Sequence, residues 1–224
     1  MAEALSTPST PSTRSDRALV TRRRMVRAAY DLFCERGYLG TTIVEVAKQA
    51  GVAVPTIYYT FGTKAVLLEE SLGAAILGFD QWREPPADPD AAALLPWHLW
   101  WDPFQAAPTP EAAFDIFFNH GVGILERAAP LVTALHGAAG DPEAAEVLRV
   151  SEGRRVEAYR EAIRVIGSKP GGLRSGLRPD TATDILVVLF SAPLYESIRT
   201  GRGWSTARTK TFLRDLLSAQ LLGR

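Results

Sequence analysis

The chain has few of the features that mark secreted or membrane proteins. Its 224 residues include one cysteine, Cys34, which excludes an internal disulfide and fits a reducing compartment. The longest apolar run, from Ile185 to Phe190, is far too short to span a bilayer. The first residues lack the apolar stretch of a signal peptide. We therefore expect a soluble, cytoplasmic protein with no membrane partner.

The sequence also lacks the usual motifs of catalysis and metal binding. The histidines, His98, His120 and His136, do not have metal-ligand spacing, and no Cys-rich or Glu-rich motif accompanies them. We find no glycine-rich phosphate loop, nucleophile elbow or paired-acid motif. These observations predict no cofactor, no metal and no enzymatic activity.

The charge of the chain is balanced overall but uneven along its length. The formal net charge is zero. Between Arg14 and Leu68, however, nine Lys or Arg residues stand against four acidic residues. A locally basic segment on a neutral chain is typical of a DNA-binding module attached to a second domain.

The hydrophobic pattern predicts helices only, because strand-type alternation is absent. Residues 1–13, rich in Ser, Thr and Pro, predict a disordered tail. Residues 84–110 hold seven of the fifteen prolines and predict a loop or short helices. The remaining pattern predicts helices over residues 15–35, 42–50, 54–61, 63–80, 111–135, 142–166, 181–200 and 205–222.

The boundaries of the short helices have clear signals. Thr42 and Glu45 form a capping-box pattern at a helix start. Gly51 suits the tight turn that follows this helix, and Pro55 suits the first turn of the next one. Gly37 is expected to end the first helix in a left-handed conformation. Two short helices joined by a glycine turn are how a protein places a helix in the major groove of DNA.

The helix expected at Val54–Phe61 has a buried side and an exposed side. Spacing residues 100° apart puts Val54, Ile57 and Phe61 together on the packed side. Pro55, Thr56 and Tyr59 point away from it, and Tyr58 and Thr60 lie on the flanks. The uncharged polar and aromatic groups of the exposed side suit contacts with base edges, thymine methyls and phosphates.

Basic residues near this helix are candidates for phosphate contacts. Lys64 lies at a helix start, where the helix dipole disfavours a cation unless a phosphate is also present. Arg22 and Arg23 belong to a basic run with Arg24 and Arg27. The alternative for all of them is a solvated surface.

Residues 21–68 resemble the N-terminal domain of the TetR family of bacterial transcriptional regulators. The pattern runs through Ala28-Ala29, Leu32-Phe33, Gly37-Tyr38, Thr41-Thr42, Val46-Ala47, Ala50-Gly51-Val52, Thr56-Ile57-Tyr58-Tyr59, Phe61 and Lys64. The resemblance implies a homodimeric repressor with an effector-binding C-terminal domain. It also implies operator contacts at Thr42, Thr56, Tyr58, Tyr59 and Lys64.

This sequence departs from the family pattern at two positions. Val54 replaces a common serine, so the recognition helix loses its usual side-chain cap. Thr60 replaces a common histidine or asparagine, which shortens a frequent phosphate contact. The candidate DNA contacts are Arg22, Arg23, Thr41, Thr42, Val54, Pro55, Thr56, Tyr58, Tyr59, Thr60 and Lys64.

The fold class that follows is all-α. It comprises an N-terminal three-helix helix-turn-helix DNA-binding domain and a larger C-terminal helical ligand-binding and dimerisation domain, with about nine helices. The expected divisions are a tail at 1–13, a DNA-binding domain at 14–68 and an effector-binding and dimerisation domain at 69–224.

Two C-terminal helices are candidates for the dimer interface. The helix after Asp184 is apolar on nearly every face and must be covered all round, and the last helix has a clear apolar stripe. An intrachain core is the alternative. The candidate interface residues are Ile185, Val188, Leu189, Phe212, Leu213, Leu216, Leu217 and Gln220.

Aromatic residues gather in the middle of the chain, where residues 97–101 hold three tryptophans. Clustered aromatics near histidines suit an apolar pocket with a few polar anchors, although a plain hydrophobic core is equally compatible. The candidate ligand-binding residues are Trp82, Trp97, His98, Trp100, Trp101, Phe104, Phe114, Phe117, Phe118, His120, Tyr159 and Tyr195.

The sequence thus predicts a repressor released from double-stranded operator DNA by a small, mainly apolar effector. One alternative is a regulator controlled by a protein partner. Another is an enzyme or carrier that retains a vestigial DNA-binding unit.

Overall fold

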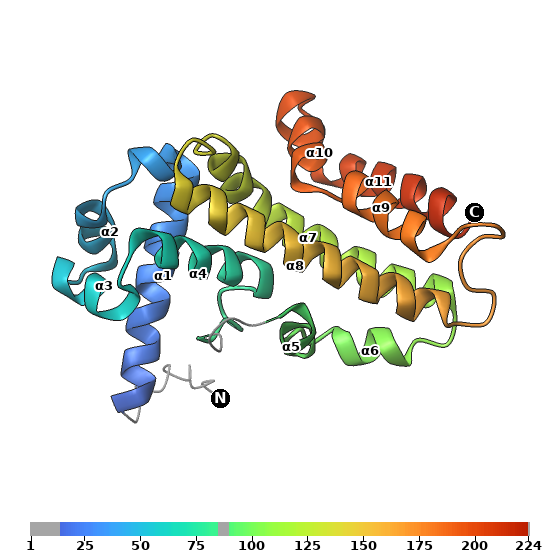
Figure 1. Ribbon diagram of the computed structural model, residues 1–224, viewed down its shortest axis with the longest axis horizontal. Coiled ribbons are helices and arrows are strands. Elements are labelled where there is room, and N and C mark those ends of the chain that lie inside the picture. The colour runs from blue at the N-terminus through green and yellow to red at the C-terminus, as the bar shows by residue number, and fades with distance from the viewer. Residues whose placement is uncertain (1–13, 85–89, 224) are drawn as a thin grey trace, which may run out of the picture.

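The computed structural model describes residues 14–84 and 90–223, and within these ranges it is helical without strands (Figure 1). Two long helices, α7 (Pro110–His136) and α8 (Pro142–Gly167), lie side by side along the longest dimension. Helices α1–α4 gather at one end of this pair, and the C-terminal helices cover the opposite end. The predicted all-α class is confirmed.

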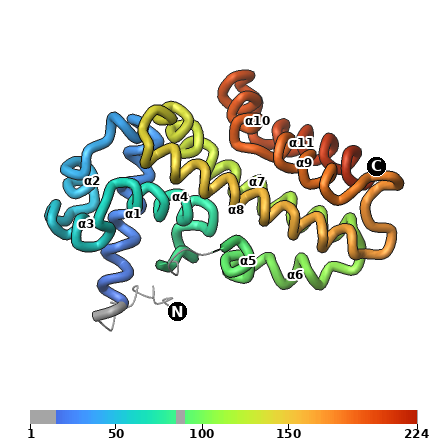
Figure 2. The backbone as a smooth tube through the Cα atoms, viewed as in Figure 1, coloured from blue at the N-terminus to red at the C-terminus, as the bar shows by residue number. Residues whose placement is uncertain are grey.

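The N-terminal helices follow the predicted order. They are α1 (Arg14–Gly40), α2 (Ile43–Ala50), α3 (Val54–Phe61) and α4 (Lys64–Leu77). Gly37 has a positive φ of 76°, as expected, but one more helical turn follows this kink before the helix ends at Gly40. The trace in Figure 2 shows α4 passing from this group towards α7 and α8.

The helix caps in this group match the sequence signals. The hydroxyl oxygen of Thr42 accepts a bond from the Glu45 amide at 3.2 Å, and the Glu45 carboxylate accepts one from the Thr42 amide at 2.9 Å. Gly51 ends α2 in the left-handed conformation with φ 65°. Ala53 precedes α3 and provides no side-chain cap. The ends of the helices in the helix-turn-helix unit are therefore set largely by interactions between residues close in sequence.

The proline-rich region is a set of short helices where the structure describes it. These are α5 (Ala91–Leu94), the 3₁₀ helix η1 (Leu95–Trp97) and α6 (Trp101–Ala106). They lie along one side of the α7–α8 pair (Figure 1). The expected tail at residues 1–13 lies outside the described residues.

The C-terminal region differs from the prediction of one helix over 181–200. It forms α9 (Pro179–Leu189), α10 (Ala192–Glu196) and a π-helical turn η2 (Ser197–Gly201), followed by α11 (Thr206–Leu221). Phe190 leaves the helical conformation with φ −113° and ψ 57°, and Ser191 caps α10 by accepting from the Leu194 amide at 3.4 Å. Pro193, which has no N–H, fits the first turn of α10. This break and the short helices bring the described α-helices to eleven.

Within the described ranges, no single helix is long and apolar enough to cross a membrane. The bent pair formed by α9 with residues 192–201 reaches the required length and composition only when the two segments are taken together.

Candidate nucleic-acid interface and effector region

Helix α3 presents aromatic side chains to solvent. Ile57 and Phe61 are buried, whereas Tyr59 is 94% exposed and Tyr58 is 52% exposed. Pro55 is exposed beside them. The predicted buried and exposed sides are confirmed, and the exposed side has the shape and chemistry needed to enter a DNA groove.

The remaining candidates on α3 are partly engaged within the chain. The Thr60 hydroxyl donates to the Thr56 carbonyl at 2.8 Å, so it satisfies a helix carbonyl when no other partner is present. Thr56 is half-buried. Val54 is half-buried and packs against the core, which leaves little of its side chain for a direct contact.

The adjacent threonines of the predicted site have different environments. Thr41 is buried, and its hydroxyl donates to the carbonyls of Gly37 at 2.8 Å and Leu32 at 3.1 Å. We therefore withdraw Thr41 from the DNA contacts, because its hydroxyl closes the kinked end of α1. Thr42 is exposed at the start of α2 and remains a candidate.

Lys64 occupies the first position of α4, as predicted, but it has partners within the chain. Its ammonium donates to the Tyr38 carbonyl and lies 4.2 Å from the centroid of the Tyr38 ring. Burial lowers the pKa of Lys64, and the nearby Asp141 opposes this shift. A carbonyl and a ring face thus offset the unfavourable helix dipole, with or without a phosphate.

Arg22 and Arg23 are corrections to the predicted DNA contacts. The Arg22 guanidinium binds the Glu70 carboxylate, and its Nη1 lies 2.8 Å from Glu84. Arg23 donates to the Trp82 carbonyl through Nε at 2.9 Å and Nη2 at 2.7 Å. Both arginines join α1 to α4 and the segment after it. The basic run marks a surface in the sequence, but only the tertiary structure shows that two of its members are used internally.

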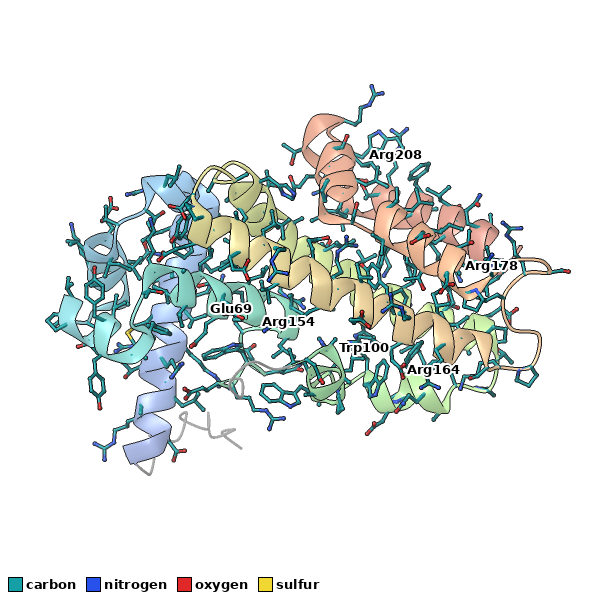
Figure 3. The ribbon with its side chains drawn as sticks, viewed as in Figure 1. Glu69, Trp100, Arg154, Arg164, Arg178 and Arg208 are labelled. Atoms are coloured by element: carbon teal, nitrogen blue, oxygen red, sulfur yellow. The ribbon has the colours of Figure 1, made fainter. Side chains whose placement is uncertain are left out.

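Helix α4 is bonded to both long helices. Arg127 of α7 donates to the Ala75 carbonyl at 2.7 Å and to the Ile76 carbonyl at 3.3 Å, which caps the last turn of α4. Arg154 of α8 pairs with Glu69 of α4 at 2.8 Å (Figure 3). Side chains of α7 and α8 thus hold the helix that follows α3.

Many of the predicted ligand residues form one network of ring contacts, which we call the aromatic cluster. Trp100 stacks on His120 with centroids 5.8 Å apart, and it meets Phe104 edge-on at 5.7 Å. In Figure 3 Trp100 lies where the chain passes from η1 to α6. The members of the aromatic cluster are His98, Trp100, Trp101, Phe104, Phe114, Phe117, Phe118, His120, Tyr159 and Phe190.

Phe190 is a cluster member that the sequence interpretation missed. It was assigned to an unbroken dimer helix, whereas its ring is buried against Phe117 at 5.7 Å and Phe118 at 5.5 Å. A Cβ atom on Gly121 would overlap the Phe190 ring, so the glycine makes room for this approach. The Ser191–Pro193 pair is the sequence signal that could have placed a helix break at Phe190.

The polar groups of the aromatic cluster are uncharged near neutral pH. Burial, with smaller contributions from the charges of Arg127 and His120, lowers the pKa of His98 to about 4. Burial also lowers the pKa of His120. The Tyr159 hydroxyl donates to the Phe190 carbonyl at 2.6 Å, and burial raises its pKa to about 12. The cluster is therefore an apolar region with neutral hydrogen-bonding groups.

Three predicted ligand residues lie apart from this network among the described residues. Trp97 lies beneath the Arg83 guanidinium at 4.2 Å, and Trp82 is buried where its carbonyl binds Arg23. Tyr195 is buried on α10, where burial and then Glu126 raise its pKa. We withdraw these three residues from the candidate ligand site, because none of them has a ring contact with a described member of the aromatic cluster.

The predicted dimer residues divide into an exposed and a buried set. Val188 is 64% exposed and Phe212 is 42% exposed, and Ile185, Leu189, Leu216 and Gln220 are partly exposed. Leu213 and Leu217 are buried within the chain, so they belong to its own core. The side of α11 that carries Leu213 and Leu217 thus faces inward, and we withdraw these two leucines from the interface.

The comparisons with known proteins agree with this architecture. Residues 25–71 match the family described as "Bacterial regulatory proteins, tetR family". No curated protein matches the chain.

Several solved structures share the fold along most of the chain. NalD of Pseudomonas aeruginosa, described as the secondary repressor of the MexAB-OprM multidrug efflux pump, is 22% identical with a TM-score of 0.62, covering 91% of this chain and 96% of its own. A protein from Rhodococcus sp. described as a TetR-family transcriptional regulator is 18% identical with a TM-score of 0.65, covering 91% and 100%. A protein from Saccharomonospora viridis described as a transcriptional regulator and solved with choline is 18% identical with a TM-score of 0.65, covering 92% and 99%.

At these identities the solved structures establish a common fold. The family match covers the helix-turn-helix unit, in which α3 has the predicted buried and exposed sides. Residues 25–71 thus match the domain of the tetR family of bacterial regulatory proteins, and the chain as a whole shares the fold of these solved structures.

Proposed function

We propose that this regulator is a homodimeric repressor that binds operator DNA through α3 and leaves it when a small, mainly apolar effector binds. The observation that carries this proposal is the exposure of Tyr59 on the second helix of the helix-turn-helix unit. The buried Ile57 and Phe61 hold the helix so that this ring projects outward. A projecting phenol can contact base edges and phosphates.

The proposed DNA contacts are those that remain accessible in the structure. Tyr58 and Tyr59 project furthest, and Pro55 can contact thymine methyl groups. Thr42 and Lys64 lie at the starts of α2 and α4, where free amides favour phosphates. The full set is Thr42, Pro55, Thr56, Tyr58, Tyr59, Thr60 and Lys64.

The proposed dimer interface is formed by the exposed residues of α9 and α11. Val188 and Phe212 give it an apolar centre, with Ile185, Leu189, Leu216 and Gln220 around them. A rigid dimer is required because two recognition helices must be about 34–36 Å apart to read successive major grooves.

The proposed effector site is at the aromatic cluster. Its buried rings and neutral histidines favour a mainly apolar molecule, and the Saccharomonospora viridis neighbour was itself solved with a small organic molecule. A ligand that preferred a displaced arrangement of α7 would shift α4 through Arg127 and change the spacing of the two α3 helices.

A second candidate function is a regulator controlled by a protein partner. The rings of the cluster pack directly on one another, as Phe114 and Phe118 do at 5.8 Å, so a ligand would have to displace them. Tryptophan fluorescence separates the two candidates, because Trp100 and Trp101 would report a ligand directly. A saturable change with small apolar compounds supports the sensor, and no response across a broad panel supports partner control.

The repressor proposal is tested by measuring binding of the full-length protein to DNA fragments from upstream of its own and neighbouring genes. We expect one or more fragments to bind specifically, with an affinity that falls as salt rises. Equal, weak binding to every fragment would overturn the proposal.

A further inference from the structure

We propose that a second small-molecule site lies between α1 and the segment that follows α4, and that it binds an organic carboxylate with an apolar body. A half-open groove of about 310 Å³ occupies this position. It is distinct from the aromatic cluster, because none of the cluster members lines it. Its volume is at the lower end of the range usual for small-molecule pockets.

The rim of the groove is cationic. Arg23, Arg24 and Arg27 of α1 line it, and the only carboxylate among the lining residues is that of Asp80. Asp31 pairs with Arg27 at 3.1 Å, so three guanidinium groups stand against two carboxylates, and the excess positive charge favours an anion. Arginine is the side chain best suited to a carboxylate because its planar fork can bind both oxygens.

The three arginines retain hydrogen-bond donors that no other described residue uses. Each guanidinium has five N–H groups. Arg23 uses Nε and Nη2 for the Trp82 carbonyl, and Arg27 uses Nε for Asp31 at 3.1 Å. Arg24 is exposed and forms no hydrogen bond or ion pair within the described residues. An incoming carboxylate would therefore find free donors without breaking the existing bonds.

The floor of the groove is apolar. Val20, which is 45% exposed, and the half-buried Phe79, whose ring centroid lies 4.4 Å from the Arg27 guanidinium, give it an accessible apolar surface, and the buried Val26, Ala74 and Trp82 support them from beneath. A bare inorganic anion would leave this floor in contact with water, and a neutral apolar molecule would leave the arginines unpaired. A carboxylate attached to a ring or a short chain can pair with the arginines of the rim and cover the apolar floor.

The position of the groove gives such a ligand a route to the DNA-binding helices. Arg23 and Arg27 hold the segment around Phe79 and Trp82 against α1, and a carboxylate that bound their unused N–H groups would add a further link between the two. The ligand would thus act at the joint between the helix-turn-helix unit and the helices of the aromatic cluster. This regulatory step rests on the proposed function, whereas the binding itself does not.

The binding is tested by titrating the full-length protein with 4-phenylbutyrate in a calorimeter, without DNA. The neutral control is 4-phenylbutan-1-ol, which has the same carbon skeleton. We expect saturable binding of the carboxylate and at least about tenfold weaker binding of the alcohol, which corresponds to about 1.4 kcal/mol. No saturable binding, or equal binding of the two compounds, would overturn the proposal.

Variants locate the bound carboxylate. Arg24→Gln and Arg27→Gln each remove one rim charge at an exposed position, and each should weaken binding about tenfold. Arg17→Gln is the matched control, because Arg17 is exposed on the same helix but does not line the groove. Binding that survives both rim variants but is lost in His120→Ala would place the compound in the aromatic cluster and contradict the proposed site.

Loss of the carboxylate site and loss of the repressor function are distinguishable. A protein that binds 4-phenylbutyrate but no DNA fragment specifically keeps the site and contradicts the proposed function. A protein that binds an operator but not 4-phenylbutyrate supports the proposed function and contradicts the carboxylate site.

Discussion

Helix α3 and the aromatic cluster contain similar side chains in opposite environments. Tyr59 projects from α3 almost fully exposed, whereas Phe104, Phe117 and Phe118 are buried. The short α3 is covered on one side only, by the residues that pack against Ile57 and Phe61. The cluster rings lie on α6, on α7 and on the residues just before α6, with Tyr159 of α8 and Phe190 after α9 packed against them. An aromatic residue is thus a contact residue or a core residue according to how many elements surround it.

The largest effect should come from truncating a ring of the cluster. Phe118→Ala removes stacking against Phe114 and Phe190 and leaves a cavity, so the free energy of unfolding should fall by about 3–5 kcal/mol. Denaturant unfolding at a fixed protein concentration measures this. A loss below about 1 kcal/mol would mean that the cluster is loosely packed, as a preformed pocket would be.

The second effect concerns the charge of His98. Its pKa is about 4 in the folded protein and near 6.5 when unfolded, so the unfolded chain binds more protons between these values. The contribution of neutral His98 to the free energy of unfolding should therefore be fully present above pH 6.5. It should decrease as the pH drops towards 4, by about 2–3 kcal/mol at pH 4.5. The difference in stability between the wild-type protein and His98→Gln, followed from pH 7 to 4.5, isolates this contribution. A constant difference would show that His98 is solvated.

The third effect concerns the exposed ring of α3. Tyr59→Ala should weaken operator binding by about 1–3 kcal/mol, while the free energy of unfolding changes by less than about 0.5 kcal/mol. Tyr59→Phe keeps the ring and removes the hydroxyl, so it shows how much of the operator affinity depends on each. Unchanged operator affinity in Tyr59→Ala would remove the main support for α3 as the recognition helix.

The smallest effect concerns Lys64. Lys64→Ala should weaken binding to all DNA sequences alike and reduce the slope of log affinity against log salt by about one. Lys64→Arg should restore the slope. If the variant loses stability but keeps the wild-type slope, the bond to the Tyr38 carbonyl is the main role of the lysine.

Local signals in the sequence were enough to place the helix-turn-helix unit. The capping box at Thr42, the left-handed Gly51 and the buried side of α3 depend on residues within about eight positions of one another. Periodicity also gave the long helices α7 and α8 within about one residue at each end. These features need no knowledge of distant parts of the chain.

Long-range partners were not visible in the sequence. Arg22 and Arg23 looked like DNA contacts until the structure paired them with Glu70 and with the Trp82 carbonyl, about 50 to 60 positions away. Leu213 and Leu217 looked like a dimer stripe because the hydrophobic pattern shows which side of a helix is apolar but not which surface covers it. The same pattern suits a core and an interface.

The sequence by itself determined the all-α class, the DNA-binding unit and the side of α3 that faces outward, because short-range hydrogen bonds and helical periodicity fix them. The tertiary structure alone decided which arginines are free, which rings meet and which leucines are covered. Those outcomes depend on contacts between distant elements. Whether a guanidinium or an aromatic ring stays exposed or is used inside the protein depends on which residues the fold places against it.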